Sequence, residues 1–179
     1  MLIEYFVLEQ DPYYKTSIKF PIQHYYKYDK SIQQSDYSGL SDFELILIEP
    51  STYNLYPDVL SKQVFMVSQK VLDAILIFDS KMNYSTRYLM DNRNKVMNTY
   101  FIPHLQAIHC LPESNKKLGA NRQSVKLDVR KILKGVHIFQ IGGMDTNVVI
   151  VSLALLEAIL RRIPEMVSYT RIESYEVKT

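Results

Sequence analysis

VVIVSLALLEAIL, residues 148–160, carries the clearest structural signal in the chain, and a near copy of it, VFMVSQKVLDAIL, lies at residues 64–76. The two copies are 84 residues apart, and the likeness continues beyond them without a gap. Between residues 64–87 and 148–171, ten of 24 aligned positions are identical, including Ser68 with Ser152 and Arg87 with Arg171. The sequence therefore predicts an internal repeat.

Each copy has the pattern of a strand followed by a helix. Its β-branched run is typical of a buried strand. Ser68 and Ser152 then stand where a helix N-cap belongs, so we interpret them as structural caps rather than nucleophiles. An apolar helix face and a returning strand near residues 168–177 follow in the second copy. We predict a strand-rich α+β fold with two pseudo-equivalent strand–helix–strand units related by the internal repeat.

The rest of the chain adds further strands and loops. Strands are predicted at residues 3–9, 43–48, 100–111 and 136–141, with one strand or none in 13–28. Residues 31–41 and 51–61 are predicted loops, residues 91–98 a polar connection and residues 128–134 a short helix. Gly142 and Gly143 predict a hairpin turn into the second copy.

Length and composition restrict the class of protein. The 179 residues suit a single domain, with a division into two lobes, 1–98 and 99–179, as the alternative. The net charge of +2 gives no whole-molecule footprint for nucleic acid, and the single cysteine fits a reducing compartment. No apolar run approaches the ~18 residues of a membrane span, and the N-terminus lacks a basic signal-peptide region. We expect a cytoplasmic protein without membrane association.

The one cysteine lies beside a histidine, which raises the question of a catalytic or metal site. Cys110 follows His109, and His104 is nearby. On a strand, neighbouring residues point to opposite faces, as do residues five apart, so the three side chains should not converge. A metal site also needs several ligands at matched spacing. We predict that Cys110 is a core residue, and that the chain has no catalytic residue, cofactor or metal.

Positive charge gathers in one segment, which we call the basic segment: Lys116, Lys117, Arg122, Lys126, Arg130, Lys131 and Lys134. Asp128 is the only acid between residues 116 and 134, so the segment carries +6 and the rest of the chain −4. One interpretation is a solvated loop and helix face. The other is a surface that binds an acidic partner or a polyanion.

Tyrosine is the second compositional bias. The chain has 14 Tyr and no Trp, and nine of the Tyr lie in the first 56 residues. Tyr is enriched at protein–protein surfaces because it offers a large contact area with a polar tip. Tyr25, Tyr26 and Tyr28 are the candidate partner-binding cluster, although any single Tyr is as readily a partly buried structural residue.

Four stretches resemble one known family: residues 4–11, the unit that begins at 64, residues 100–114, and residues 127–141 leading into 148–160. They are similar to the immunity proteins of bacterial polymorphic-toxin systems, in particular the eleventh numbered immunity family, typified by a myxobacterial immunity protein. The positions that fit the family's closing pattern are Lys131, Ile132, Gly135, Ile138, Phe139, Ile141, Val151, Ser152, Leu156 and Ile159. Residues 12–60 carry little of the resemblance.

The resemblance implies a small non-enzymatic protein that binds and neutralises a cognate protein toxin, and it brings no catalytic residues with it. Occlusion of the toxin's active site, through the basic segment and exposed N-terminal Tyr, would be the mechanism. Two alternatives remain: a nucleic-acid-binding or regulatory module that uses the basic segment, and an unrecognised enzyme that uses Cys110 with a histidine.

Overall fold

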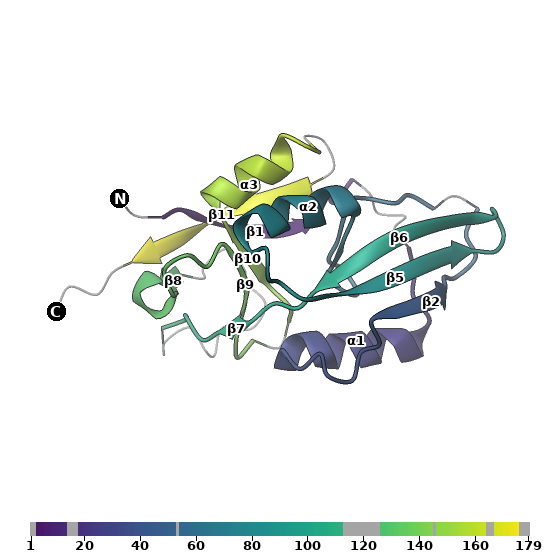
Figure 1. Cartoon of the computed structure of the whole chain (residues 1–179), viewed down its shortest axis with the longest axis horizontal. Helices are drawn as coiled ribbons and strands as arrows, with labels where there is room; N and C mark the ends of the chain where they lie inside the picture. The colour runs from purple at the N-terminus through teal and green to yellow at the C-terminus, as the bar shows by residue number, and fades with distance from the viewer. Residues whose placement is uncertain are drawn as a thin grey trace.

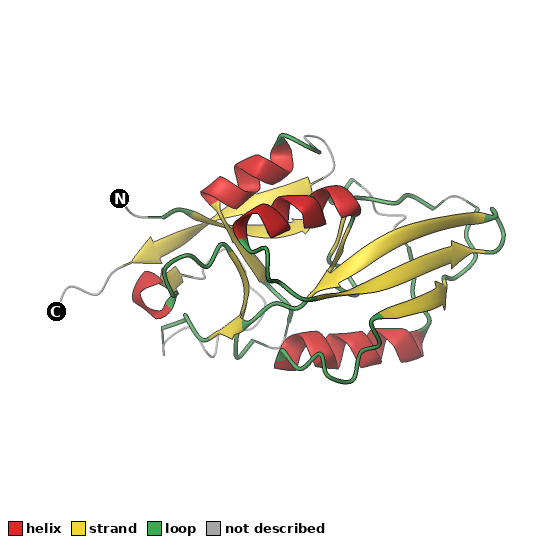
Figure 2. Cartoon of the chain, viewed as in Figure 1, coloured by secondary structure: helices red, strands yellow, loops and turns green. Residues whose placement is uncertain are grey.

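The computed structural model describes residues 3–13, 18–52, 54–112, 126–144, 146–163 and 167–175. Within the first helix, the side chains of residues 22, 25, 26, 29 and 30 are not described. The fold is α+β and strand-rich, as predicted (Figure 2). No helix in these ranges is long and apolar enough to cross a membrane.

The strands form two sheets (Figure 1). The six-stranded sheet has the order β7 (Ala107–Ile108), β9 (Ile138–Ile141), β10 (Val149–Ser152), β1 (Tyr5–Gln10), β11 (Val167–Tyr175) and β8 (Lys126–Asp128). The five-stranded sheet has the order β2 (Phe43–Leu47), β5 (Tyr84–Asp91), β6 (Val96–Pro103), β4 (Met66–Val67) and β3 (Val59–Leu60). The helices are α1 (Ile22–Gln34), α2 (Gln69–Phe78) and α3 (Leu153–Leu160).

Both sheets contain strands in a matching arrangement. The order β3-β4-β6-β5-β2 corresponds to β9-β10-β1-β11-β8, with three antiparallel pairings followed by one parallel pairing in each. β1 therefore takes the place in its sheet that β6 takes in the other. Matching topology alone does not establish a duplicated sequence, and Arg87 is fully buried whereas Arg171 lies at the surface. The internal repeat stays a prediction.

Three clusters of buried side chains make up the core. One joins the two sheets, because α2 and α3 both pack in it together with side chains from β1, β4, β6 and β10. A second lies between α1 and the five-stranded sheet, and a third lies on the six-stranded sheet beside β8 and β9. The suggested lobe boundary at residues 98 and 99 falls inside β6, and β1 belongs to the sheet of the C-terminal half.

The helix α1 corrects the prediction for residues 13–41. We expected a loop at 31–41 and one strand or none before it, but the chain is helical from Ile22 to Gln34. The buried face of α1 carries Tyr28 and Ile32, one turn apart. Most residues of α1 are polar, so the sequence contains no apolar run that would mark this helix.

Several smaller predictions can be compared with the structure. β9 and β10 pair antiparallel around Gly142 and Gly143, so the hairpin turn is confirmed, and Gly143 adopts a positive φ of 80°. The helix predicted at 128–134 is only a 3₁₀ turn, Val129–Lys131. The polar connection at 91–98 is shorter than predicted, because β5 and β6 extend into it and pair as a hairpin.

The two serines begin their helices in different ways. Both occupy the N-cap position with extended backbone angles. Ser152 Oγ accepts a hydrogen bond from the Leu155 backbone N–H at 3.3 Å, as a cap should. Ser68 Oγ instead donates to Asp58 Oδ1 at 2.5 Å and makes no capping hydrogen bond.

Candidate functional site: an open face of the five-stranded sheet

The cysteine and histidines of the predicted strand at 100–111 do not form one site. Cys110 is fully buried, and burial raises the pKa of its thiol to about 11, so the thiol stays protonated at neutral pH. The His109 ring lies about 3.0 Å from where a Cβ would stand on Gly142. His104 Nε2 is 2.8 Å from Ser85 Oγ.

The Ser85–His104 contact has the spacing of a nucleophile and its base, but its surroundings are unlike those of a catalytic pair. Ser85 is buried in β5, and the ring of Tyr37 stacks on His104 at 4.3 Å. Burial, then the charge of Arg87, lowers the pKa of His104. A nucleophile must be reached by its substrate, and Ser85 is covered. In the described ranges, no group of three or more His, Cys, Asp or Glu side chains could hold a metal ion.

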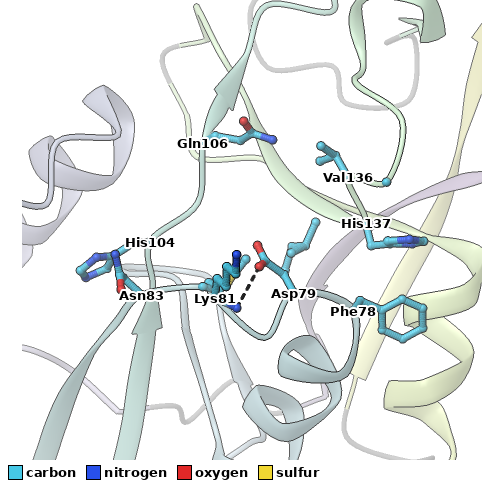
Figure 3. Close-up of a pocket in the computed structure, with 11 residues that line it drawn as sticks. Phe78, Asp79, Lys81, Asn83, His104, Gln106, Val136 and His137 are labelled. Carbon is cyan, nitrogen blue, oxygen red and sulfur yellow. Dashed lines mark hydrogen bonds between the residues drawn. The ribbon is translucent and has the colours of Figure 1, made fainter.

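A pocket of about 320 Å³ lies where α2 ends, near the start of β5 and the chain before β9. His104 and His137 stand at opposite ends of it, with Asp79 and Lys81 between them (Figure 3). Both rings are engaged elsewhere, because His137 Nδ1 lies 2.8 Å from Ser152 Oγ. The pocket therefore does not bring the two histidines together as an acid–base pair.

A charged cluster lies between α1 and the five-stranded sheet, centred on Glu44 of β2. Its carboxylate accepts hydrogen bonds from Tyr28 Oη at 2.7 Å and Lys27 Nζ at 3.1 Å. Burial alone would raise the pKa of Glu44, but the hydrogen bonds and the nearby charges of Lys27 and Arg87 outweigh it and lower the pKa. Tyr28 is thus fully buried, which corrects its assignment to a partner-binding surface.

Arg87 is the least expected member of this cluster. Its guanidinium is fully buried, 5.1 Å from the Tyr28 ring, and its nearest carboxylate oxygen is Glu44 Oε2 at 3.9 Å from Nε. Nη1 donates to the carbonyl oxygens of Ser41 and Thr86, whereas Nε and Nη2 have no hydrogen-bond partner among the described residues. Since a buried unpaired charge is costly, Glu44 is the main electrostatic support of Arg87.

The structure describes only part of the basic segment. Lys116, Lys117 and Arg122 lie outside the described residues. Three of the four described bases have partners within the chain: Lys126 pairs with Glu173 at 2.7 Å, Arg130 with Asp128 at 3.1 Å, and Lys131 Nζ donates to the Leu111 carbonyl at 3.2 Å. Lys134 is exposed. The described part of the basic segment lies at the β8 end of the molecule, away from α1, so these four bases and α1 do not form one surface (Figure 1).

A different surface stands out on the five-stranded sheet. The side chains of Phe43, Leu45 and Leu47 alternate along β2 on one face, and they are 71%, 58% and 52% exposed. Three isolated apolar side chains would be unremarkable, but these are contiguous and lie in register with further apolar residues.

Strand pairing shows how far this surface extends. Leu45 lies beside Tyr88 of β5, and Leu47 lies beside Met90, which in turn lies opposite Met97 of β6. We call this surface the open face and define it by Phe43, Leu45, Leu47, Tyr88, Met90 and Met97.

None of the helices that the structure describes covers the open face. α1 packs on the opposite side of this sheet, against Ile46 and Leu89. α2 lies on the same side as the open face but contacts β4 and β6, where Val67 and Phe101 join its core. The β5–β6 hairpin and β2 extend beyond α2 (Figure 1).

Comparison with known proteins gives no further identification. No protein-family model matches the chain, and a search of curated proteins finds no match.

Proposed function

We propose that the chain is an immunity-type protein that binds and neutralises a cognate bacterial toxin, without catalysis of its own. The open face is the observation that carries the proposal. Contiguous exposed apolar surface rimmed by polar residues is characteristic of protein–protein contact sites. The resemblance of the sequence to polymorphic-toxin immunity proteins supplies the class of partner.

The proposed mechanism is occlusion by a preformed surface. An ordinary specific interface buries roughly 800 Å² on each partner. The open face would supply its apolar centre, and the polar residues of the β5–β6 turn and of the segments flanking β2 would supply its rim. Because the open face is part of a hydrogen-bonded sheet, little conformational entropy would be lost on binding. We further propose that this encounter takes place in the cytoplasm.

The two alternatives have less support. A nucleic-acid-binding surface needs free positive charge, whereas Lys126, Arg130 and Lys131 are engaged within the chain. A Cys–His enzyme needs an accessible thiolate, whereas Cys110 is buried and protonated. Both observations favour a binding protein over these alternatives.

The test is co-expression with the protein encoded immediately upstream or downstream, followed by size-exclusion chromatography and a growth assay. We expect a one-to-one complex and relief of toxicity. Leu45→Ser should weaken the complex at least ten-fold, because it removes an apolar side chain from the centre of the open face. The matched control is Leu133→Ser, since Leu133 is 69% exposed but lies near the basic segment instead.

The results for these variants show whether the open face, the basic segment or both contribute to binding. A complex that tolerates Leu45→Ser would refute the role of the open face. The double variant Arg130→Glu with Lys131→Glu tests the basic segment: slower association with weaker salt dependence would assign it a contribution, and an unchanged association rate would remove it. A chain that elutes alone beside a harmless neighbour would contradict the toxin-binding proposal itself.

A further inference from the structure

β2 is an edge strand of the five-stranded sheet. Its hydrogen bonds to β5 determine which of its backbone groups point away from the sheet. The Thr86 N–H donates to the Asp42 carbonyl at 2.6 Å, and the Ile48 N–H donates to the Met90 carbonyl at 3.1 Å. Backbone groups of successive residues point to alternate sides of a strand, so the even-numbered residues of β2 face β5. The N–H and C=O groups of Phe43, Leu45 and Leu47 therefore point away from the sheet.

The same three residues thus present outward backbone groups and exposed apolar side chains. Natural proteins usually protect such an edge with Lys, Pro, a bulge or a covering element. Within β2, no residue is Lys or Pro. Among the residues that the structure describes, protection begins only past the end of β2, where the Glu49 N–H donates to the Lys19 carbonyl and Pro50 follows. An accessible edge of about five residues has room for one short added strand.

Charges at the two ends of this edge indicate what kind of strand would fit. Asp42 and Glu49 are exposed, and neither forms an ion pair with a residue that the structure describes. The one acid within β2, Glu44, points to the other face and is occupied by Tyr28 and Lys27. An incoming strand with Lys or Arg at both ends would complement the flanking carboxylates.

A second copy of this chain fits the edge poorly. If β2 paired antiparallel with itself about Leu45, Asp42 would lie within one residue of Glu49 from the other copy. If it paired parallel in register, each carboxylate would face its own copy. Like charges placed opposite each other on paired strands are destabilising. The charges therefore favour a different protein.

We propose that β2 binds its partner by strand addition: an extended partner segment, apolar at alternate positions and basic at both ends, pairs with the outward edge at Phe43, Leu45 and Leu47. Backbone hydrogen bonds would supply affinity, and the open face would receive the alternating side chains. The proposal rests on the toxin-binding function for the identity of the partner. The chemistry of the edge itself is independent of that identity.

The direct test uses the full chain and a defined probe, the acetylated and amidated peptide Lys-Val-Thr-Val-Thr-Val-Lys. Amide hydrogen exchange is followed by NMR with and without millimolar peptide. We expect exchange at Phe43, Leu45 and Leu47 to slow at least five-fold, with no change for a peptide that has Glu at both ends. No protection, or equal protection by both peptides, would overturn the proposal.

Two variants isolate the backbone and the charges. Leu45→Pro removes an outward N–H without removing a hydrogen bond to β5, and Leu45→Val is its matched control because it keeps the N–H. Peptide binding should fall at least ten-fold in the first relative to the second. The double variant Asp42→Lys with Glu49→Lys, which leaves the strand intact, should reverse the preference toward the acidic peptide. Unaltered preference would overturn the proposal even if the proline variant failed to fold.

Binding to the protein encoded next to this chain can test strand addition separately from the toxin-binding function. A complex that Leu45→Ser disrupts, but that Leu45→Pro and Leu45→Val affect equally, would preserve toxin binding and refute strand addition. Peptide protection at the edge in a chain that forms no complex with its neighbour would preserve strand addition and refute the toxin-binding role.

Discussion

Glu44→Gln tests whether one carboxylate supports the buried charge of Arg87. The substitution keeps the shape of the side chain and an acceptor for the Tyr28 hydroxyl, but it removes the negative charge. In the described part of the chain, Arg87 has no other carboxylate within salt-bridge distance. Its guanidinium would therefore be left buried without a counter-charge, which is the costly half of breaking an ion pair.

The structure sets the size of the effect. Two unit charges about 4 Å apart attract by about 4 kcal/mol at the effective dielectric constant of a pair near the surface. The separation here is 3.9 Å, and the Glu44 side chain is 23% exposed, so water screens part of this attraction. We expect the free energy of unfolding to fall by about 2–3 kcal/mol, which lowers the melting temperature by roughly 4–12 °C in a chain of this length.

Thermal unfolding at neutral pH, followed by circular dichroism, measures this loss, and Glu49→Gln is the matched control. Glu49 is exposed and has no ion pair with a described residue, so its substitution should change stability by less than about 0.5 kcal/mol. If Glu44→Gln melted within ~1 °C of Glu49→Gln, the reasoning would be refuted. Arg87 would then owe its burial to the Tyr28 ring and the two carbonyl groups alone.

The pH dependence of stability tests the same interaction between Glu44 and Arg87 in a second way. The pKa of Glu44 in the folded chain lies below its ordinary value of 4.5. Its contribution to stability is therefore present above pH 4.5 and is lost as the pH falls through the lower folded-state pKa. The gap in melting temperature between the wild type and Glu44→Gln should narrow as the pH falls below 4.5. A gap that stayed constant down to the acid transition would contradict the role of the Glu44 charge.

Three further predictions concern the rest of the fold. The Cys110 thiol should resist a thiol-reactive dye in the folded chain and react fully in denaturant; labelling at the same rate in both would contradict its burial. Ser152→Ala should lower the free energy of unfolding by about 1–2 kcal/mol, because it removes the cap on the Leu155 N–H, and unchanged urea unfolding would refute that role. Gly142→Ala should be destabilising, since its Cβ would stand about 3.0 Å from the His109 ring, and unchanged thermal stability would show that the ring moves aside.

The sequence predicts the fold best where a strand and the helix after it are almost continuously apolar. The unit at 148–160 forms β10 and α3 in the predicted places because its strand and helix residues are almost all apolar. Helix α1 could not be predicted in the same way, since most of its residues are polar and its buried side chains, among those described, are Tyr28 and Ile32. Its stability depends on tertiary contacts, among them the Glu44 carboxylate from a distant strand.

The open face could not be recognised from sequence for a related reason. The run FELIL at 43–47 predicts a strand, and β2 occupies those residues. Its alternation would normally place the charged residue outside, yet Glu44 points inward and Phe43, Leu45 and Leu47 point outward. Glu44 is held inward by hydrogen bonds from Tyr28 and Lys27 of α1, with Arg87 of β5 nearby. Because α1 was not predicted from the sequence, only the assembled fold reveals this inversion. The partner-binding role of the basic segment stays a prediction.

The position of β1 has a consequence for how the chain emerges from the ribosome. Phe6 pairs with Val151 and Arg171, so β1 is completed by β10 and β11, which are translated long after it. At 5–20 residues per second, β1 waits on the order of ten seconds for both neighbours. All five strands of the other sheet lie within residues 43–103 and need no such delay. The sheet that carries the open face can therefore assemble on the nascent chain, before translation ends.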